Sequence, residues 1–164
     1  MAKNIHTFDE PAALTSVALF HDMFNMPVLQ SPTIPAENRC ELRIALLQEE
    51  LDELKSAIVQ NDIVGIADAL SDLQYVLSGA VLEFGLGDKF KQLFDEVQRS
   101  NMSKTCKSME EAKATQAHYL KEKNTDSYIE ERDGEYLVFR QSDNKVLKSV
   151  EYSAPDLETI LFKP

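Results

Sequence analysis

The stretch that decides the fold runs from Arg43 to Leu77 and reads RIALLQEELDELKSAIVQNDIVGIADALSDLQYVL. Apolar residues recur at spacings of three and four on both sides of Asn61–Asp62, which predicts two helices, from about 36 to 60 and from 63 to about 84. The stripes comprise Ile44, Leu47, Leu51, Leu54 and Ile58, then Ile63, Ile66, Leu70, Leu73 and Leu77. Because the link is so short, the two helices must pack antiparallel.

The sequence on either side predicts two further helices and a small appendage. One helix begins near Pro11, and a loop with three prolines follows it before residue 36. A further helix starts at about Asp88 and ends near residue 105. We therefore expect an all-α protein, an antiparallel bundle of about four helices that occupies residues 1–105.

After Lys104 the pattern changes to a short helix and then to strands. Ser108 and Glu111 have the spacing of a capping box, which predicts a helix to about residue 123. Asp133–Gly134 between two apolar runs predicts a β-hairpin with a type I′ turn, and a second turn at 142–144 could add a third strand. Residues 106–164 are thus expected to be an appendage, a short helix plus a β-hairpin, that packs on the same domain.

Composition excludes several classes of function. The net charge of −11 argues against a nucleic-acid partner, and no apolar run is long enough to span a membrane. Cys40 and Cys106 lie far apart and are expected to be reduced thiols. The first six residues lack the apolar core of a secretory signal, so a cytoplasmic protein is expected.

Five carboxylates form the first candidate site. On a helical wheel, Glu49, Glu50 and Glu53 make one patch that starts at the border of the apolar stripe. Asp68 and Asp72 lie one turn apart on the next helix, on a face that antiparallel packing can bring opposite Glu50 and Glu53. Crowded carboxylates repel one another, and oxygen ligands suit Mg²⁺ or Mn²⁺, so a metal is the natural counter-charge. Composition alone favours the plainer interpretation, a solvated helix face.

A second candidate site lies at the end of the fourth helix. Its apolar stripe comprises Phe90, Leu93, Phe94 and Val97. The next positions at the same spacing are Asn101 and Lys104. A lysine and an amide that extend an inward stripe could bind a phosphate chain, whereas the plainer interpretation is a helix that leaves the core.

These residues resemble the motifs of the all-α nucleotide pyrophosphohydrolases, which include MazG, dimeric dUTPases and phosphoribosyl-ATP pyrophosphohydrolase. Glu49, Glu50 and Glu53 match the first motif, Glu-Glu-x-x-Glu. Asp72 matches the end of the second motif, Glu-x-x-Asp, but Ala69 occupies its glutamate position. Asp68 lies one place before Ala69. Its role stays open: it is a metal ligand, a group that acts through water, or a residue without a role in the site.

The likeness continues outside the motifs. It includes 20–28, 43–50, 96–104, 140–148 and 152–157, and it covers about 8–105 and 139–157 of the chain. The stretch from about 106 to 138 is similar to an insertion relative to one branch of the family, and its role is open.

The resemblance implies Mg²⁺-dependent hydrolysis of a nucleoside triphosphate between the α and β phosphates. It implies that Glu50, Glu53 and Asp72 hold metal, with Glu49 as a further ligand or as the base. The substrate-binding residues that it suggests are Asn101, Lys104, Arg140, Lys145 and Lys148 for the phosphates or sugar, and His21 and Phe24 for the base. A lone histidine on an apolar stripe is more often a core residue. Family members generally assemble, so a homodimer or homotetramer is expected.

Alternatives remain within and beyond this class. The enzyme could be a base-specific dUTP or dCTP pyrophosphatase, or a phosphoribosyl-ATP pyrophosphohydrolase, because nothing in one sequence identifies the base. A rival of another class is a non-catalytic acidic helical module that binds a protein. In that module Glu49, Glu50 and Glu53 would be mere surface.

Overall fold

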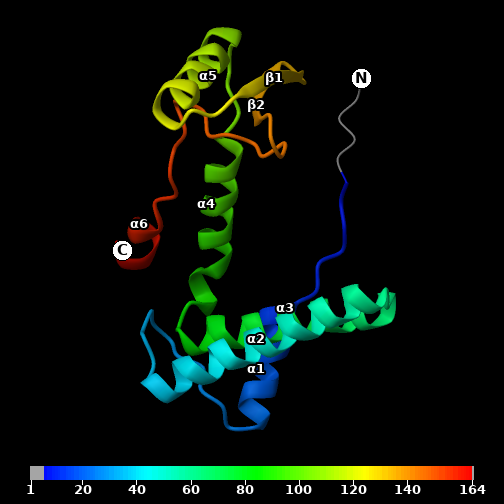
Figure 1. Cartoon of the computed structure of the whole chain (residues 1–164). Coiled ribbons are helices and arrows are strands. Elements are labelled where there is room, and N and C mark those ends of the chain that lie inside the picture. The colour runs from blue at the N-terminus through cyan, green and yellow to red at the C-terminus, as the bar shows by residue number, and fades with distance from the viewer. Residues whose placement is uncertain (1–5, 164) are drawn as a thin grey trace. The chain divides into compact units, whose positions relative to one another are not determined.

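The computed structural model describes residues 6–163, which form helices and one two-stranded sheet (Figure 1). The elements are α1 (Ala13–Met23), α2 (Glu37–Gln60), α3 (Ile63–Glu83), the short 3₁₀ helix η1 (Gly87–Lys89), α4 (Phe90–Met102), α5 (Met109–Lys123), β1 (Ser127–Arg132), β2 (Glu135–Arg140) and α6 (Leu157–Phe162). The predicted class, mostly helical with a C-terminal hairpin, is confirmed. The first five residues, on which the expected lack of a secretory signal depends, lie outside the described range. No helix within that range is both long and apolar enough to cross a membrane.

The chain packs as two compact units. One comprises residues 7–90, with α1, α2 and α3, and the other comprises 91–163 together with His6. Helix α4 therefore groups with the C-terminal segment, whereas the sequence placed it with the other helices. The predicted domain boundary after residue 105 stays a prediction, because packing within one chain does not define a domain that folds by itself.

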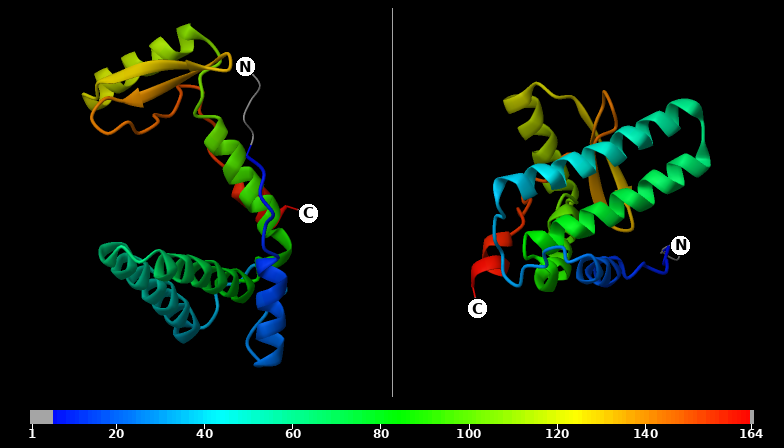
Figure 2. Two further views of the ribbon diagram at one scale, coloured as in Figure 1. Left: turned by 90° about the vertical axis from the view of Figure 1, so that its right-hand side faces the viewer. Right: turned by 90° about the horizontal axis from the view of Figure 1, so that it is seen from below.

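The antiparallel pair of α2 and α3 is the centre of the first unit, and the views of Figure 2 show the two helices side by side. Asn61 adopts a left-handed conformation, with φ of 55°, and ends α2. Asp62 then caps α3 by accepting hydrogen bonds from the backbone of Val64 and Gly65, at 3.0 and 3.1 Å. The predicted two-residue link and its cap are confirmed.

Two glycines of α3 allow the helices to approach closely. A Cβ atom at Gly65 would lie 3.1 Å from Cβ of Ala57, and one at Gly79 would lie 2.6 Å from the guanidinium of Arg43. Both contacts fit a single antiparallel register, in which position 57 of α2 faces position 65 of α3 and position 43 faces position 79. That register brings Glu50 opposite Asp72.

A buried ionic network fixes the same register near the start of α2. Glu83 has no exposed surface and accepts hydrogen bonds from Arg39 and from Arg43, which is itself 4% exposed. Burial alone would raise the pKa of Glu83, but the bonds from Arg39 and Arg43 hold it below its usual value. Such a group is costly to bury unless it is paired, so this network commits α2 and α3 to one alignment.

The predicted apolar stripes are not the faces that α2 and α3 bury against each other. Arg43 and Ala57 are the buried residues that α2 contributes, whereas the stripe on α2 is largely exposed: Ile44 69%, Leu51 50%, Ile58 58%. On α3, Leu70 is 53% and Leu77 is 41% exposed. Leu47, Leu54, Ile66 and Leu73 of the same stripes are half-buried, so the chain itself covers the two stripes only in part.

The loop formed by residues 25–36 runs alongside the C-terminal end of α3. The backbone of Leu29 donates to Leu82 at 3.0 Å, and that of Thr33 donates to Phe84 at 3.0 Å. Gly85, with φ of 66°, lies where a Cβ atom would overlap the carbonyl of Ser31. Glycine is thus required there both for its conformation and for the passage of the loop.

The second unit has its own small core between α5 and the hairpin. Cys106, Ala112, Val138 and Leu147 are buried together, with Tyr119, Ile129 and Tyr136 packed against them. Ser108 caps α5 as predicted, accepting from the backbone of Glu111 at 3.2 Å. The hairpin turn has positive φ at Asp133 and Gly134, as the predicted type I′ turn requires. The suggested third strand is absent from the described residues, where Phe139 and Val146 form an isolated bridge.

Candidate functional site

The acidic residues predicted on α2 and α3 act on one another. Burial is the first cause that raises the pKa of Glu50, and the charges of Asp72, Glu53, Glu49 and Asp68 follow in that order. All five carboxylates therefore share one local field. Asp72 ranks first among the charges, as expected from the register that places it opposite Glu50.

The five carboxylates differ in exposure. Glu50 and Asp72 are half-buried between the helices, whereas Glu49, Glu53 and Asp68 are exposed. Ala69, which occupies the glutamate position of the family motif, is 2% exposed. The carboxylate nearest to that position in the sequence is Asp68, one place earlier.

The next feature of this cluster is the absence of a protein cation as partner within the described residues. Among the described residues, no Lys, Arg or His lies within ion-pair distance of these five carboxylates. Arg43, the nearest inward cation in the sequence, is committed to Glu83. Nowhere in residues 6–163 do three His, Cys, Asp or Glu side chains converge as a ready-made metal site. The donor set is all-oxygen and anionic, which fits a hard divalent cation in chemistry.

His21 lies in the core of the first unit. It is 1% exposed, and its Nδ1 donates to the carbonyl of Pro27 at 2.8 Å. Nε2 must then be the acceptor of the contact with Arg43 Nη2 at 3.3 Å. The ring thus joins the network around Glu83, and stacking on a base would require it to leave the core.

Phe24 has a different environment, because its side chain is 62% exposed. Its ring packs on that of Phe20, with centroids 4.4 Å apart, and Phe20 in turn meets Tyr75 edge-on at 5.7 Å. This row of rings runs from α1 to α3, and Tyr75 is three residues beyond Asp72. Base stacking by Phe24 stays a prediction.

The predicted phosphate-binding residues lie in the second unit. Lys104 Nζ donates to Asn101 Oδ1 at 2.7 Å, and Lys148 Nζ lies 4.1 Å from the ring centroid of Tyr152. Arg140 is bound through two nitrogens to Asp143, at 2.7 and 2.5 Å, so its charge is largely neutralised. Lys145 is exposed.

The inward face of α4 differs from the predicted one. Leu93 and Ser100 are its buried residues, whereas Phe94 is 63% and Val97 38% exposed. Asn101 is exposed, and Lys104 is half-buried but lies two residues beyond Met102, the last residue of α4. The expectation that Asn101 and Lys104 continue the inward stripe is therefore wrong. Sequence reasoning missed Ser100, which lies one turn beyond Glu96 and seven residues after Leu93, a spacing that could have identified it.

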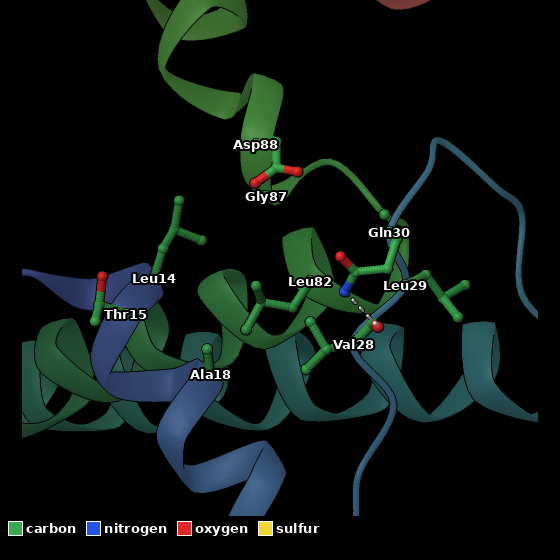
Figure 3. Close-up of a pocket in the computed structure, with 10 residues that line it drawn as sticks. Leu14, Thr15, Ala18, Val28, Leu29, Gln30, Leu82, Gly87 and Asp88 are labelled. Atoms are coloured by element: carbon green, nitrogen blue, oxygen red, sulfur yellow. Dashed lines mark hydrogen bonds between the residues drawn. The ribbon is translucent and has the colours of Figure 1, made fainter.

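A pocket of about 350 Å³ lies in the first unit (Figure 3). Leu14 and Ala18 reach it from α1, Val28 and Gln30 from the loop, and Leu82 from α3. The amide of Gln30 donates to the carbonyl of Val28 at 3.4 Å, drawn as the dashed line. None of the predicted site residues lines this pocket, so it is distinct from the acidic cluster.

Comparisons with known proteins agree with this arrangement. The chain is 26% identical to an uncharacterised protein of Acanthamoeba polyphaga mimivirus, over 61% of this chain and 50% of that protein. The chain thus spans about half the length of that relative. The family described as phosphoribosyl-ATP pyrophosphohydrolase matches residues 17–101, just over half of the chain, and the match includes all five carboxylates. With Glu50 and Asp72 facing each other on antiparallel helices, the chain belongs to the phosphoribosyl-ATP pyrophosphohydrolase family of the MazG-like all-α nucleotide pyrophosphohydrolases.

Proposed function

We propose that this protein is a Mg²⁺-dependent nucleoside triphosphate pyrophosphohydrolase of the cytoplasm, which releases a nucleoside monophosphate and pyrophosphate. The observation that carries the proposal is the grouping of Glu50 with four other carboxylates, which raise its pKa and which have no protein cation as partner among residues 6–163. Family membership supports pyrophosphohydrolase chemistry on a nucleotide. The two free thiols, Cys40 and Cys106, support a reducing compartment.

In the proposed reaction, a water oxygen bonds to the α-phosphorus, and the bond from that phosphorus to the bridging oxygen breaks. Pyrophosphate leaves with the bridging oxygen, and the monophosphate keeps the oxygen of the water. Bound Mg²⁺ supplies charge stabilisation on the phosphoryl oxygens and a lower pKa for the water.

The chain's own residues divide this work. Glu50, Glu53 and Asp72 hold the metal, and Asp68 is available as a further ligand. Glu49, exposed and outside the contact between the helices, serves as a ligand or accepts the proton of the water. Lys104 and Lys148 neutralise the phosphates that leave.

The exposed stripes of α2 and α3 support a homodimer or homotetramer. Six large aliphatic side chains of these stripes are at least 41% exposed, namely Ile44, Leu51, Ile58, Ile63, Leu70 and Leu77. Burial of each side chain contributes about 1.5–3 kcal/mol. A second copy that covers these faces would leave the carboxylates at the edge of the interface.

The test is pyrophosphate release from a panel of nucleoside triphosphates, including dUTP and dCTP, and from phosphoribosyl-ATP. Each substrate is offered with Mg²⁺ and with Mn²⁺. Cleavage of at least one compound, abolished by EDTA, is expected. If nothing on the panel is cleaved with either metal, the proposal fails. A non-catalytic protein-binding module would instead leave every activity and metal titration unchanged in Glu50→Gln and Glu53→Gln.

A further inference from the structure

Strand β2 is bonded along both of its sides in the second unit. On one side it pairs with β1 in an antiparallel ladder (Figure 1). On the other side, Tyr136 exchanges two backbone hydrogen bonds with Cys106, at 2.8 and 2.9 Å, and the carbonyl of Val138 accepts from Leu147 at 2.8 Å. Strand β2 is thus the central strand of this small sheet, and β1 is an edge strand.

The alternation of backbone groups identifies the residues on the outer edge of β1. Glu131 is opposite Tyr136, and Ile129 is opposite Val138. Since Tyr136 and Val138 direct their backbone groups away from β1, Ile129 and Glu131 direct theirs away from β2. Within the part of the chain that the structure describes, no hydrogen bond reaches the backbone of Ile129 or Glu131 on that side. Such an edge is a template for another strand.

A groove of about 320 Å³ lies at the start of β1. Residues 125–127 form one side of the groove, and a stripe of α5 that contains Lys113 and Leu120 forms the other. Leu120 is 54% exposed. Lys113 is exposed and has no ion pair with any of the described residues. The groove therefore offers a cation and an apolar side chain beside the strand edge.

Charged side chains flank the edge on both faces of the sheet. Ile129 packs against the core beneath α5, so Glu131 lies on that face and Arg132 lies on the opposite one. Asp126 precedes β1 and shares the face of Arg132, and its carbonyl accepts from the backbone of Gln141 at 2.9 Å, which continues the ladder by one pair. An acid at one end of the edge and a base at the other suit antiparallel pairing of two identical strands.

We propose that β1 pairs with β1 of a second copy of this chain, in antiparallel orientation and with Ile129 opposite Ile129 on a two-fold axis. In that register Ser127 lies opposite Glu131 of the second copy. Each of these pairs can exchange two backbone hydrogen bonds, so the free groups of the edge are all satisfied. The contact lies outside residues 17–101, which the family model matches, and it is independent of the proposed activity.

The same register matches charges on both faces of the sheet. Arg132 lies opposite Asp126 of the second copy, and the two-fold axis repeats this pair at the other end of the edge. On the face that α5 covers, Glu131 of the second copy lies opposite Ser127, next to the groove that Lys113 lines. Charges usually keep a strand edge from pairing, but opposite charges across neighbouring strands stabilise a sheet. This complementarity selects a second copy over an unrelated strand.

Registers shifted by two places are less favourable. One shift puts Glu130 opposite Glu130 and Ser127 opposite Asp133, which lies in the hairpin turn with φ of 51°. The opposite shift puts Glu131 opposite Thr125, whose backbone nitrogen already donates to α5. Each shift loses hydrogen bonds at both ends of the edge, and the first also sets like charges against each other.

Disulfide cross-linking tests the register. Tyr128 and Glu130 of the second copy would form a non-hydrogen-bonded pair, with Cα atoms about 4.5 Å apart, close enough for a disulfide. Tyr128→Cys and Glu130→Cys are made in full chains that carry Cys40→Ser, since Cys106 is 0% exposed. An oxidised mixture of the two variants should give a covalent dimer, whereas neither variant alone should. No dimer from the mixture, or as much dimer from one variant alone, would overturn the register.

Exchange of the end charges tests the same pairing without cysteine. All chains carry Ile44→Asp, so that the exposed stripe of α2 does not contribute. Arg132→Asp should weaken self-association about tenfold in sedimentation velocity, because each dimer loses two ion pairs and gains two like-charged pairs. The double variant Asp126→Arg/Arg132→Asp should restore association to within about threefold. A double variant as weak as the single one would show that these charges do not face each other.

The matched control is Glu130→Gln in the same background. Glu130 is the ion-pair partner of Arg132 within the strand, so this change breaks that pair at 2.8 Å and keeps both end charges. It should associate like the parent chain. Weakening as large as that of Arg132→Asp would mean that the ion pair within the strand, and not the contact between copies, is responsible.

Hydrogen exchange distinguishes a second copy from any other occupant of the edge. The amides of Ile129 and Glu131 should become more protected as the protein concentration rises through the micromolar range. The amides of Tyr128 and Glu130 point toward β2 and should be protected at every concentration. Fast exchange of Ile129 and Glu131 at all concentrations would overturn self-pairing and leave the edge for an extended segment of another protein.

Discussion

Arg43 donates to the buried carboxylate of Glu83, and this pair aligns α2 with α3 so that Glu50 lies opposite Asp72. The ion pair and the acidic cluster lie about two helical turns apart along the same two helices. The ion pair is electrically neutralised and fixes the register of the two helices. The acidic cluster is a set of carboxylates that this register brings together without neutralising their charge.

Removing Glu83 should therefore destabilise the fold rather than change the chemistry directly. Glu83→Ala leaves two arginines without their buried partner, and breaking such a pair costs about 3–5 kcal/mol. Urea denaturation should show that loss in the free energy of unfolding. Asp95→Ala breaks the exposed pair with Lys91 and should cost less than about 1 kcal/mol. Equal losses in the two variants would contradict the role given to Glu83.

Glu50→Gln should have opposite effects on activity and on stability. As a metal ligand, Glu50 should be needed for turnover, with a loss of about a hundredfold or more in kcat. In EDTA at pH 7, however, burial and then the neighbouring carboxylates disfavour its charged form, which is why the pKa of Glu50 is raised in the fold. A raised carboxyl pKa destabilises the folded state above that pKa, so the variant should melt at a higher temperature than the wild type.

The control for that experiment is Glu41→Gln, an exposed residue of α2 outside the acidic cluster. It should leave both the turnover and the melting temperature close to those of the wild type. A Glu50→Gln variant that melts lower in EDTA, or that turns over normally, would show that the carboxylates are surface groups.

Glu96 should give the second unit an acid-sensitive component of stability. Its pKa is lowered to about 2 because Arg99 binds both carboxylate oxygens and the backbone of Asp156 donates to one of them. A depressed pKa stabilises the fold above the unfolded value of 4.5, and that stabilisation is lost as the pH falls toward about 2. The difference in the free energy of unfolding between the wild type and Glu96→Gln should shrink across this range.

Urea denaturation at several pH values between 2 and 6 measures that difference, with Glu131→Gln, a change at an exposed residue of β1, as the control. A constant difference between the wild type and Glu96→Gln would mean that the carboxylate is not paired in solution.

The parts that could be predicted from the sequence are those that depend on local chemistry. The Asn61–Asp62 link, the caps at Asp62 and Ser108 and the turn at Asp133 follow from neighbouring residues. The grouping of the carboxylates also followed, because one short link forces antiparallel packing.

The faces of the helices could not be predicted in the same way. Periodicity identifies an apolar stripe but not the surface that covers it, and α2 packs on α3 through Ala57 and Arg43 instead. The bond between Ser100 and Tyr152 joins residues 52 positions apart, and no local pattern encodes such a contact. Lys104 and Asn101 were singled out from a stripe of which α4 buries only Leu93.

The exposed stripe of α2 leads to a prediction about assembly. Ile44 is 69% exposed, and Leu51 and Ile58 of the same stripe are 50% and 58% exposed. If a second copy covers this face, Ile44→Asp places a charge in the interface of both copies and should weaken association at least about a hundredfold. Sedimentation velocity across a concentration series measures the change. Ile34→Asp, at a loop residue that is 83% exposed, is the matched control and should assemble like the wild type. A wild-type chain that stays monomeric throughout the micromolar range would contradict the homo-oligomer, and the stripe would then need another partner.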